Sequence, residues 1–182
     1  MFGQFKARAE AVSAVVDRVP TRQKALATIV ALLRDEGVAN QPGSYAVWAA
    51  GPFLDGLDRA ALQAEVPGLR FDLSRPLAAE ARVGITEVDF AVADTGTLAV
   101  AADDVAQRLA STLPSLHIAL VATSRLVPDL AALFQRLGPA RSRYLALVTG
   151  PSRTADIERV LTIGVHGPSR LVVIFVDAWE GA

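Results

Sequence analysis

The 182-residue chain contains no cysteine. It therefore forms no disulfide and has no cysteine nucleophile, and it cannot by itself hold a thiolate zinc site or a cysteine-ligated iron–sulfur cluster. Histidine is also scarce, because His117 and His166 are the only two. We therefore expect no dedicated metal site, although Asp94, Asp156 and His166 are a set that could meet around one ion.

An excess of charge of one sign and a long apolar segment are also missing. The 18 basic and 19 acidic residues give a net charge of −1, so no broad electrostatic attraction to nucleic acid or an anionic membrane is expected. Charged residues in 1–10 occupy positions where a signal peptide needs an apolar run. The aliphatic run at 171–176 is far shorter than the roughly 18 residues that span a bilayer. We expect a cytoplasmic protein.

The chain is rich in apolar residues, which make up 52% of it and suffice to bury a substantial core. Neither a low-complexity tract nor a linker interrupts it. We therefore predict a single domain over residues 1–182, with N-terminal helices at about 4–37 and an α/β core at about 45–178.

Hydrophobic spacing predicts the elements of this core. Apolar residues recur at three- and four-residue intervals in four segments, which predicts helices at 5–19, 22–33, 57–66 and 125–138. Near-continuous runs rich in Val, Ile and Leu are typical of strands covered on both faces in a parallel sheet, and they lie at 117–123, 143–149 and 171–177. Shorter strands are predicted at 45–51 and 69–74, whereas 76–82 is ambiguous. Together these elements predict an α/β fold, a three-layer sandwich with a mostly parallel sheet.

One segment departs from this alternation. Residues 90–93 and 98–101 have strand character and flank Asp94, Thr95, Gly96 and Thr97, which predicts a hairpin with a tight turn at Gly96. The preceding residues 86–89 fit a helix capping box, so at most one helical turn is expected before the hairpin. A hairpin attached to the parallel strands makes the sheet partly mixed.

The tetrapeptide Gly-Pro-Ser-Arg occurs twice, at 150–153 and 167–170, but its flanks differ, so it is not a repeat. The first copy follows a predicted strand and opens a predicted helix, which Ser152 or Thr154 caps and which carries Asp156 in its first turn. A helix N-terminus at the carboxyl end of a strand favours an anion, and Arg153 adds a charge-assisted contact. The alternative interpretation is ordinary turn and capping chemistry.

The second copy follows His166, which is either an acid–base group, a ligand donor or a surface residue. The right-handed crossover rule places residues 150–153 and His166 at opposite edges of the sheet, so we expect the two copies to lie apart. Arg170 is then an ordinary residue at the beginning of a strand, and His117 a structural residue in a buried one. Neither a Walker loop nor a G-x-G-x-x-G motif is present, which leaves nucleotide-binding functions of those types without support.

Four segments, residues 86–100, 113–121, 149–158 and 164–168, resemble in order and spacing the lactate utilization protein C family, the LUD-domain proteins. The resemblance implies a fold similar to the NagB/RpiA/CoA-transferase and 5-formyltetrahydrofolate cyclo-ligase group. It further implies a subunit of a system that oxidises L-lactate to pyruvate together with iron–sulfur partner proteins. The iron–sulfur clusters would then belong to the partners, with no cofactor in this chain.

The resemblance carries over ligand-site candidates but no catalytic residue. They are Asp94, Thr95, Gly96, Thr97, Gly150, Ser152, Arg153, Thr154, Asp156, His166 and Gly167, together with Pro151 and Pro168. Asp94 stands where the family often has Glu, which shortens its reach by one methylene. The expected ligand is a small anion. Two alternatives stay open: a stand-alone enzyme acting on a phosphorylated or CoA-like substrate, and a non-catalytic scaffold.

Overall fold

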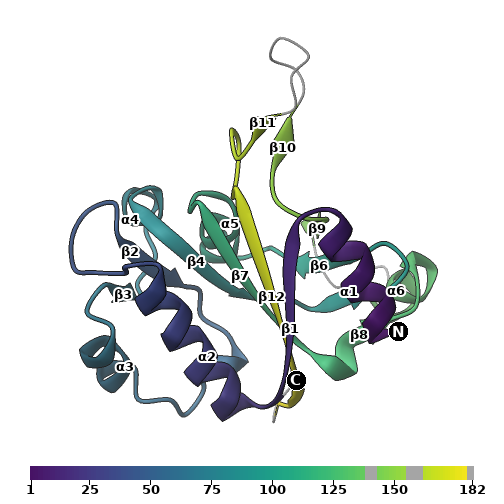
Figure 1. Cartoon of the computed structure of the whole chain (residues 1–182), viewed down its shortest axis with the longest axis horizontal. Coiled ribbons are helices and arrows are strands. Elements are labelled where there is room, and N and C mark those ends of the chain that lie inside the picture. Colours follow the sequence, from purple (N-terminus) through teal and green to yellow (C-terminus); the bar gives the residue numbers. More distant parts are fainter. Residues whose placement is uncertain (138–142, 155–161, 180–182) are drawn as a thin grey trace.

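A main parallel sheet forms the centre of the protein, whose computed structural model describes residues 1–137, 143–154 and 162–179 (Figure 1). Within these residues its strands follow the order β1-β12-β7-β4-β2-β3. Their bounds are β1 (Ala14–Thr21), β12 (Arg170–Ala178), β7 (Leu116–Ala122), β4 (Ala81–Glu87), β2 (Tyr45–Trp48) and β3 (Leu69–Arg70). Every neighbouring pair is parallel, so all carboxyl ends meet at one edge, the carboxyl edge, and all amino ends at the other, the amino edge.

A second, smaller sheet lies against the main one. Its order is β8 (Leu126–Val127), β5 (Phe90–Val92), β6 (Thr97–Ala101) and β9 (Leu145–Val148). The predicted hairpin is confirmed as the antiparallel pair β5–β6, with Gly96 at φ +67° in its turn. It belongs to this second sheet, which is mixed, and not to the edge of the parallel sheet.

The placement of β9 corrects a prediction. This strand runs antiparallel to β6 in the second sheet, whereas the sequence predicted that residues 143–149 belong to the same parallel sheet as residues 171–177. The strand is only partly buried, and Leu147 is 46% exposed. A short apolar run does not show whether one or both faces of a strand are covered, and this ambiguity caused the error.

Helices cover the sheets in layers. The helices α2 (Arg22–Asp35) and α3 (Arg59–Glu65) pack on one face of the main sheet, where Ile29, Leu33 and Trp48 join the core. The other face is covered by the second sheet together with α1 (Phe2–Ala11), α4 (Arg75–Ala79) and α5 (Val105–Thr112). Helix α6 (Leu130–Leu137) packs on β5 and β8. These layers confirm the predicted α/β fold. Two short 3₁₀ turns lie at Pro52–Leu54 and Thr123–Arg125.

The predicted N-terminal helix over residues 5–19 is wrong in its second half. Helix α1 ends at Ala11, Ser13 takes a positive φ of 71°, and β1 then pairs with β12. Within β1, Ala14 and Val16 are buried while Val15 is 52% exposed, which is the two-residue alternation of a strand. Valine at 15, 16 and 19 favours this outcome, because β-branched side chains fit strands better than helices.

The helix predicted after Gly150 is also wrong where the structure describes it. Residues Arg153–Thr154 form strand β10, antiparallel to β11 (Thr162–Ile163), and this hairpin projects from the body of the molecule (Figure 1). Asp156 and the rest of the predicted helix lie outside the described residues. The backbone N–H of Ser152 donates to the Pro168 carbonyl over 2.8 Å. The two Gly-Pro-Ser-Arg copies therefore lie side by side, contrary to the predicted separation.

The remaining predictions agree with the structure except at element ends and at 86–89, where the end of strand β4 (Ala81–Glu87) replaces the expected helical turn. The helix at 22–33 is α2, which ends before Gly37 at φ +69°, and the segment at 76–82 becomes the end of α4 and the start of β4. Residues 126–127, predicted as helix, form strand β8 before α6 begins. Helix α5 was not predicted. No helix in the described part of the chain has the length and apolarity to cross a membrane.

Candidate functional site

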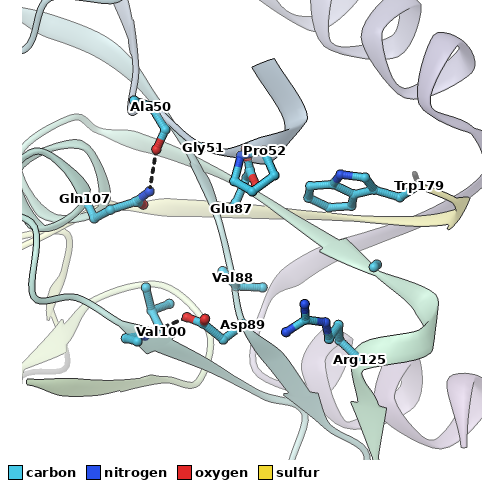
Figure 2. A pocket seen from close by; sticks show the side chains of 12 residues that line it. Ala50, Gly51, Pro52, Glu87, Val88, Asp89, Val100, Gln107, Arg125 and Trp179 are labelled. Atoms are coloured by element: carbon cyan, nitrogen blue, oxygen red, sulfur yellow. Dashed lines mark hydrogen bonds between the residues drawn. The ribbon is translucent and has the colours of Figure 1, made fainter. Parts of the chain in front are cut away.

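A cavity of about 200 Å³ lies at the carboxyl edge of the main sheet, near the ends of β2, β4, β7 and β12. We call it the carboxyl-edge cavity. Its chemistry-bearing wall residues are Gly51, Glu87, Asp89, Gln107, Arg125 and Trp179, which Figure 2 shows around it. Open α/β sheets bind ligands at this edge, so its position alone makes it a candidate site.

Glu87 is the last residue of β4, and its side chain is largely buried. The Oε1 atom accepts a hydrogen bond from the Phe53 N–H over 2.7 Å. Burial raises the pKa of Glu87 from 4.5 to about 7, with the Phe53 hydrogen bond opposing the rise and the nearby Asp55 charge adding to it. The carboxyl group therefore populates both protonation states near neutral pH, which suits an acid–base role.

Gly51 makes room for this carboxyl group. A Cβ atom at Gly51 would lie 2.6 Å from Glu87 Cδ and 2.9 Å from its Oε2, well inside van der Waals contact. The backbone around it is held by Arg22, whose Nε donates to the Phe53 carbonyl over 2.9 Å. The loop after β2 thus fixes the Glu87 carboxyl group through Phe53 and leaves space for it at Gly51.

Asp89 and Arg125 differ in whether their charged groups have a polar partner among the described residues. Asp89 Oδ2 accepts a hydrogen bond from the Ala101 N–H over 2.7 Å, which links the residue before β5 to the end of β6. The Arg125 guanidinium lies 5.6 Å from the centre of the Phe90 ring. It forms no ion pair with a carboxylate in the described part of the chain. Arg125 is therefore a cation at the cavity wall that remains available to an anion.

Two buried polar atoms in the wall have no hydrogen-bond partner among the described residues. They are Gln107 Oε1 and Trp179 Nε1, an acceptor and a donor. The Gln107 side chain is itself held in place, since its Nε2 donates to the Ala50 carbonyl over 3.1 Å. An unpaired buried polar group costs about 1–3 kcal/mol, so a ligand that supplies the partners gains affinity.

The residues predicted from sequence lie elsewhere. In the hairpin turn, Asp94 and Thr95 are exposed. Gly96 packs on α1, where a Cβ atom would lie 2.5 Å from the Ala9 nitrogen. Its positive φ and this close approach both require glycine, so the turn serves packing of the N-terminal helix.

The first Gly-Pro-Ser-Arg copy packs on the same N-terminal segment. Gly150 has φ +72°, and a Cβ atom there would lie 2.7 Å from the Val12 carbonyl oxygen. Arg153 donates to that carbonyl over 2.6 Å and to Ser13 Oγ over 3.0 Å. The guanidinium predicted to bind an anion therefore holds the junction between α1 and β1.

Some of the predicted residues do gather at a second cavity, of about 270 Å³, at the amino edge. Gly150, Ser152, His166 and Gly167 line it, and we call it the amino-edge cavity. Thr97 lies nearby, with its hydroxyl hydrogen-bonded to that of Thr149 over 2.8 Å. The Thr154 side chain and Asp156 lie outside the described part of the structure. The predicted set is therefore divided between packing positions and this second cavity.

His117 forms part of the same cavity wall, and the structure confirms that it is buried. It is 1% exposed, and its Nε2 lies 2.8 Å from the Thr86 hydroxyl. Burial lowers the pKa of His117 from 6.5 to about 4, so the ring is neutral at pH 7. The described residues contain no group of three His, Asp or Glu side chains placed to hold a metal ion.

The sequence did not single out Glu87, Gln107, Arg125 or Trp179. Glu87 belongs to the segment 86–89 that fitted a capping box, and the strand ending at this residue was not assigned. Had residues 81–87 been identified as a parallel strand, the ligand-binding tendency of strand carboxyl ends would have indicated Glu87. The other three are far apart in the chain and belong to no motif, so only the fold brings them together.

The chain is similar to curated proteins that are named for lactate utilization. It is 38% identical over 107 residues to "Lactate utilization protein C" of Macrococcus caseolyticus, a match covering 56% of this chain and 46% of that protein. It is 35% identical over 106 residues to the protein of the same name from Halalkalibacterium halodurans, covering 55% and 46%. The chain thus spans about half the length of the curated relatives it matches.

The fold and the family are also matched along nearly the whole chain. A crystal structure of a DUF162 family protein from Deinococcus radiodurans has the same fold, with a TM-score of 0.68 and 22% identity over 96% of this chain and 95% of that one. The LUD domain family model matches residues 2–176. The chain therefore belongs to the LUD domain family.

Proposed function

We propose that this chain acts in lactate utilization, as a cytoplasmic subunit that binds a small 2-hydroxy or 2-oxo carboxylate in the carboxyl-edge cavity. The system in which it acts oxidises L-lactate to pyruvate together with iron–sulfur partner proteins. The names of the relatives support the pathway. The observation that carries the site is one cavity holding both Glu87, with a pKa of about 7, and Arg125, which pairs with no carboxylate among the described residues.

The two ends of a hydroxy acid have different partners in this cavity. The guanidinium of Arg125 pairs with the carboxylate, because planar charge-assisted hydrogen bonds suit that group. The indole N–H of Trp179 is a further donor without a partner among the described residues. The hydroxyl end is left to the acceptors Glu87 and Gln107 Oε1.

Glu87 supplies the proton chemistry. Oxidation of lactate to pyruvate removes two electrons and two protons, one of them from the hydroxyl group. The Glu87 carboxylate accepts this proton, a contribution typically worth about 10²–10⁴-fold in rate. The C2 hydrogen would leave with the electron pair as a hydride, and a two-electron acceptor on the partner proteins would take it. Their iron–sulfur clusters would then carry the electrons one at a time, since a chain without cysteine holds no cysteine-ligated cluster alone.

The composition of the cavity wall favours this function over a phosphorylated or CoA-like substrate. Arg125 is the one cationic side chain among the described lining residues, and Glu87 and Asp89 are acidic. Phosphate groups are usually held by several donors or cations, whereas a monocarboxylate needs one. Turnover of a phosphosugar or an acyl-CoA by the purified chain would support the alternative.

The test is lactate-dependent dye reduction by the chain reconstituted with its partner proteins. We expect Glu87→Gln to lower the rate about 100-fold or more, and Arg125→Ala to raise the lactate concentration needed for half-maximal rate about tenfold or more. Asp94→Asn, in the exposed hairpin turn, is the control and should leave both unchanged. Full activity of a correctly folded Glu87→Gln variant would disprove the assigned site.

A further inference from the structure

Among the described residues, no Asp, Glu, Lys or Arg side chain lines the amino-edge cavity. The described residues that line it are Leu, Val, Pro, Gly, Ser and Thr residues and the two histidines. It lies at the start of β7 and β12, on the opposite edge of the main sheet from Glu87. We propose that it is a second binding site, which takes an uncharged organic molecule with an apolar body and a hydrogen-bonding head group.

The apolar part of the site is built from β9 and the two adjoining loops. Leu147 lines the cavity although its side chain is 46% exposed, so it presents apolar surface to solvent at the cavity wall. Leu171 and Pro168 continue the apolar wall inward. A ligand with an apolar body removes this surface from water, which is the main source of affinity in such cavities.

The polar part consists of groups that can donate or accept without carrying charge. His117 is buried and neutral, and its Nε2 is engaged with Thr86. A neutral imidazole offers one donor and one acceptor nitrogen. The side chains of Ser152 and His166 also line the cavity, and the described part of the chain contains no hydrogen bond to either of them.

Charged ligands are disfavoured because the two described arginines near these loops already have partners. Arg153 is bound to the Val12 carbonyl and Ser13, and Arg170 pairs with Glu36 over 2.7 Å. Neither arginine lines the cavity. A carboxylate or an ammonium group would lose hydration there and meet no opposite charge among the described lining residues, which is costly. The anion predicted from the Gly-Pro-Ser-Arg motif is therefore replaced by a neutral ligand.

The test uses three molecules of similar shape and different charge: benzyl alcohol, benzoate and benzylammonium. Both histidines of the chain line this cavity, so their ring signals in an NMR titration report on it directly. We expect benzyl alcohol to shift the His117 and His166 signals saturably. The two ions should bind more weakly, by a factor of about ten or more. Unshifted ring signals with benzyl alcohol, or equal affinity for the three molecules, would overturn the proposal.

Two leucines of similar exposure provide a matched pair of variants. Leu147→Ser removes apolar surface from the cavity wall and should weaken benzyl alcohol binding about fivefold. Leu113 is 41% exposed but does not line the cavity, so Leu113→Ser should leave the affinity unchanged. Equal effects of the two substitutions would contradict the site. Glu87→Gln should not alter this binding, which keeps the result independent of the function proposed for the carboxyl-edge cavity.

Discussion

The two edges of the main sheet hold cavities of opposite chemical character. The carboxyl-edge cavity has an acid with a pKa of about 7. It also has an arginine and two buried polar atoms that lack, respectively, an ion pair and hydrogen-bond partners among the described residues. The described lining of the amino-edge cavity contains no Asp, Glu, Lys or Arg, although it includes some of the motif residues that suggested an anion site. Helix α5 contributes to both, with Gln107 on one side and Ser111 and Thr112 on the other. The glycines of these motifs mark close backbone packing, whereas the proposed acid–base role falls on Glu87, which was not among the site residues predicted from the motifs.

The largest expected effect tests the packing role of the motif loop. Gly150→Ala introduces a Cβ atom against the Val12 carbonyl in a left-handed backbone conformation, so we expect it to lower the free energy of unfolding by about 2–4 kcal/mol. The measurement is urea denaturation. Gly37→Ala has a similar φ of +69° but nothing within 4 Å, and should cost only about 1 kcal/mol. Equal costs for the two variants would show that Gly150 has no special packing role.

A smaller effect tests the geometry at the carboxyl edge. Gly51→Ala places a methyl group where the Glu87 carboxyl group lies, and the flexible side chain must move away. We expect lactate-dependent activity to fall about tenfold, because misplacing a catalytic group by an ångström is costly, while the thermal unfolding temperature changes little. Gly3→Ala, in open space on α1, is the control. Unchanged activity of the Gly51→Ala variant would contradict the assigned role of Glu87 in the reaction.

The smallest expected effect is on the pH dependence of folding stability, to which Glu87 at one edge and His117 at the other contribute in opposite directions. The raised pKa of Glu87 makes the folded chain bind more protons than the unfolded chain, so its contribution lowers stability as pH rises from 4.5 to about 7. The lowered pKa of His117 acts oppositely, raising stability as pH rises from about 4 to 6.5. Glu87→Gln removes only the first contribution.

Relative to the unsubstituted chain, the Glu87→Gln variant should therefore gain about 1–2 kcal/mol of stability between pH 4.5 and pH 7, allowing for solvent screening of a partly exposed group. Urea denaturation at several pH values measures this difference, in which the His117 contribution cancels. A stability difference that does not vary with pH would mean that the Glu87 pKa is ordinary.

The sequence predicted the elements whose local pattern is unambiguous. The runs that became β7 and β12 are long and apolar, and Gly96 identified the hairpin turn. The family resemblance was likewise confirmed along residues 2–176. The hydrophobic pattern gave the wrong element where a segment fits both a helix and a strand, as at Val15 and Val16. At Leu147 it gave the right element, a strand, but the wrong sheet.

The candidate site was less predictable than the fold. Glu87, Arg125 and Trp179 are separated by 38 and 54 positions in the sequence and approach one another only because parallel strands and their following loops end at one edge. The pKa of Glu87 likewise depends on burial under the loop around Phe53. Neither the proximity of these three residues in the fold nor the burial of Glu87 is visible in a single sequence.

Calorimetric titration of the purified chain with L-lactate at several pH values tests the central claim most directly. A lactate carboxylate in the same cavity favours the protonated form of Glu87, so the affinity should fall about tenfold as pH rises through 7. Glu87→Gln should remove this pH dependence, and Arg125→Ala should weaken lactate binding about tenfold or more. Lactate binding that is independent of pH and unaffected by both substitutions would contradict the assignment of the carboxyl-edge cavity as the functional site.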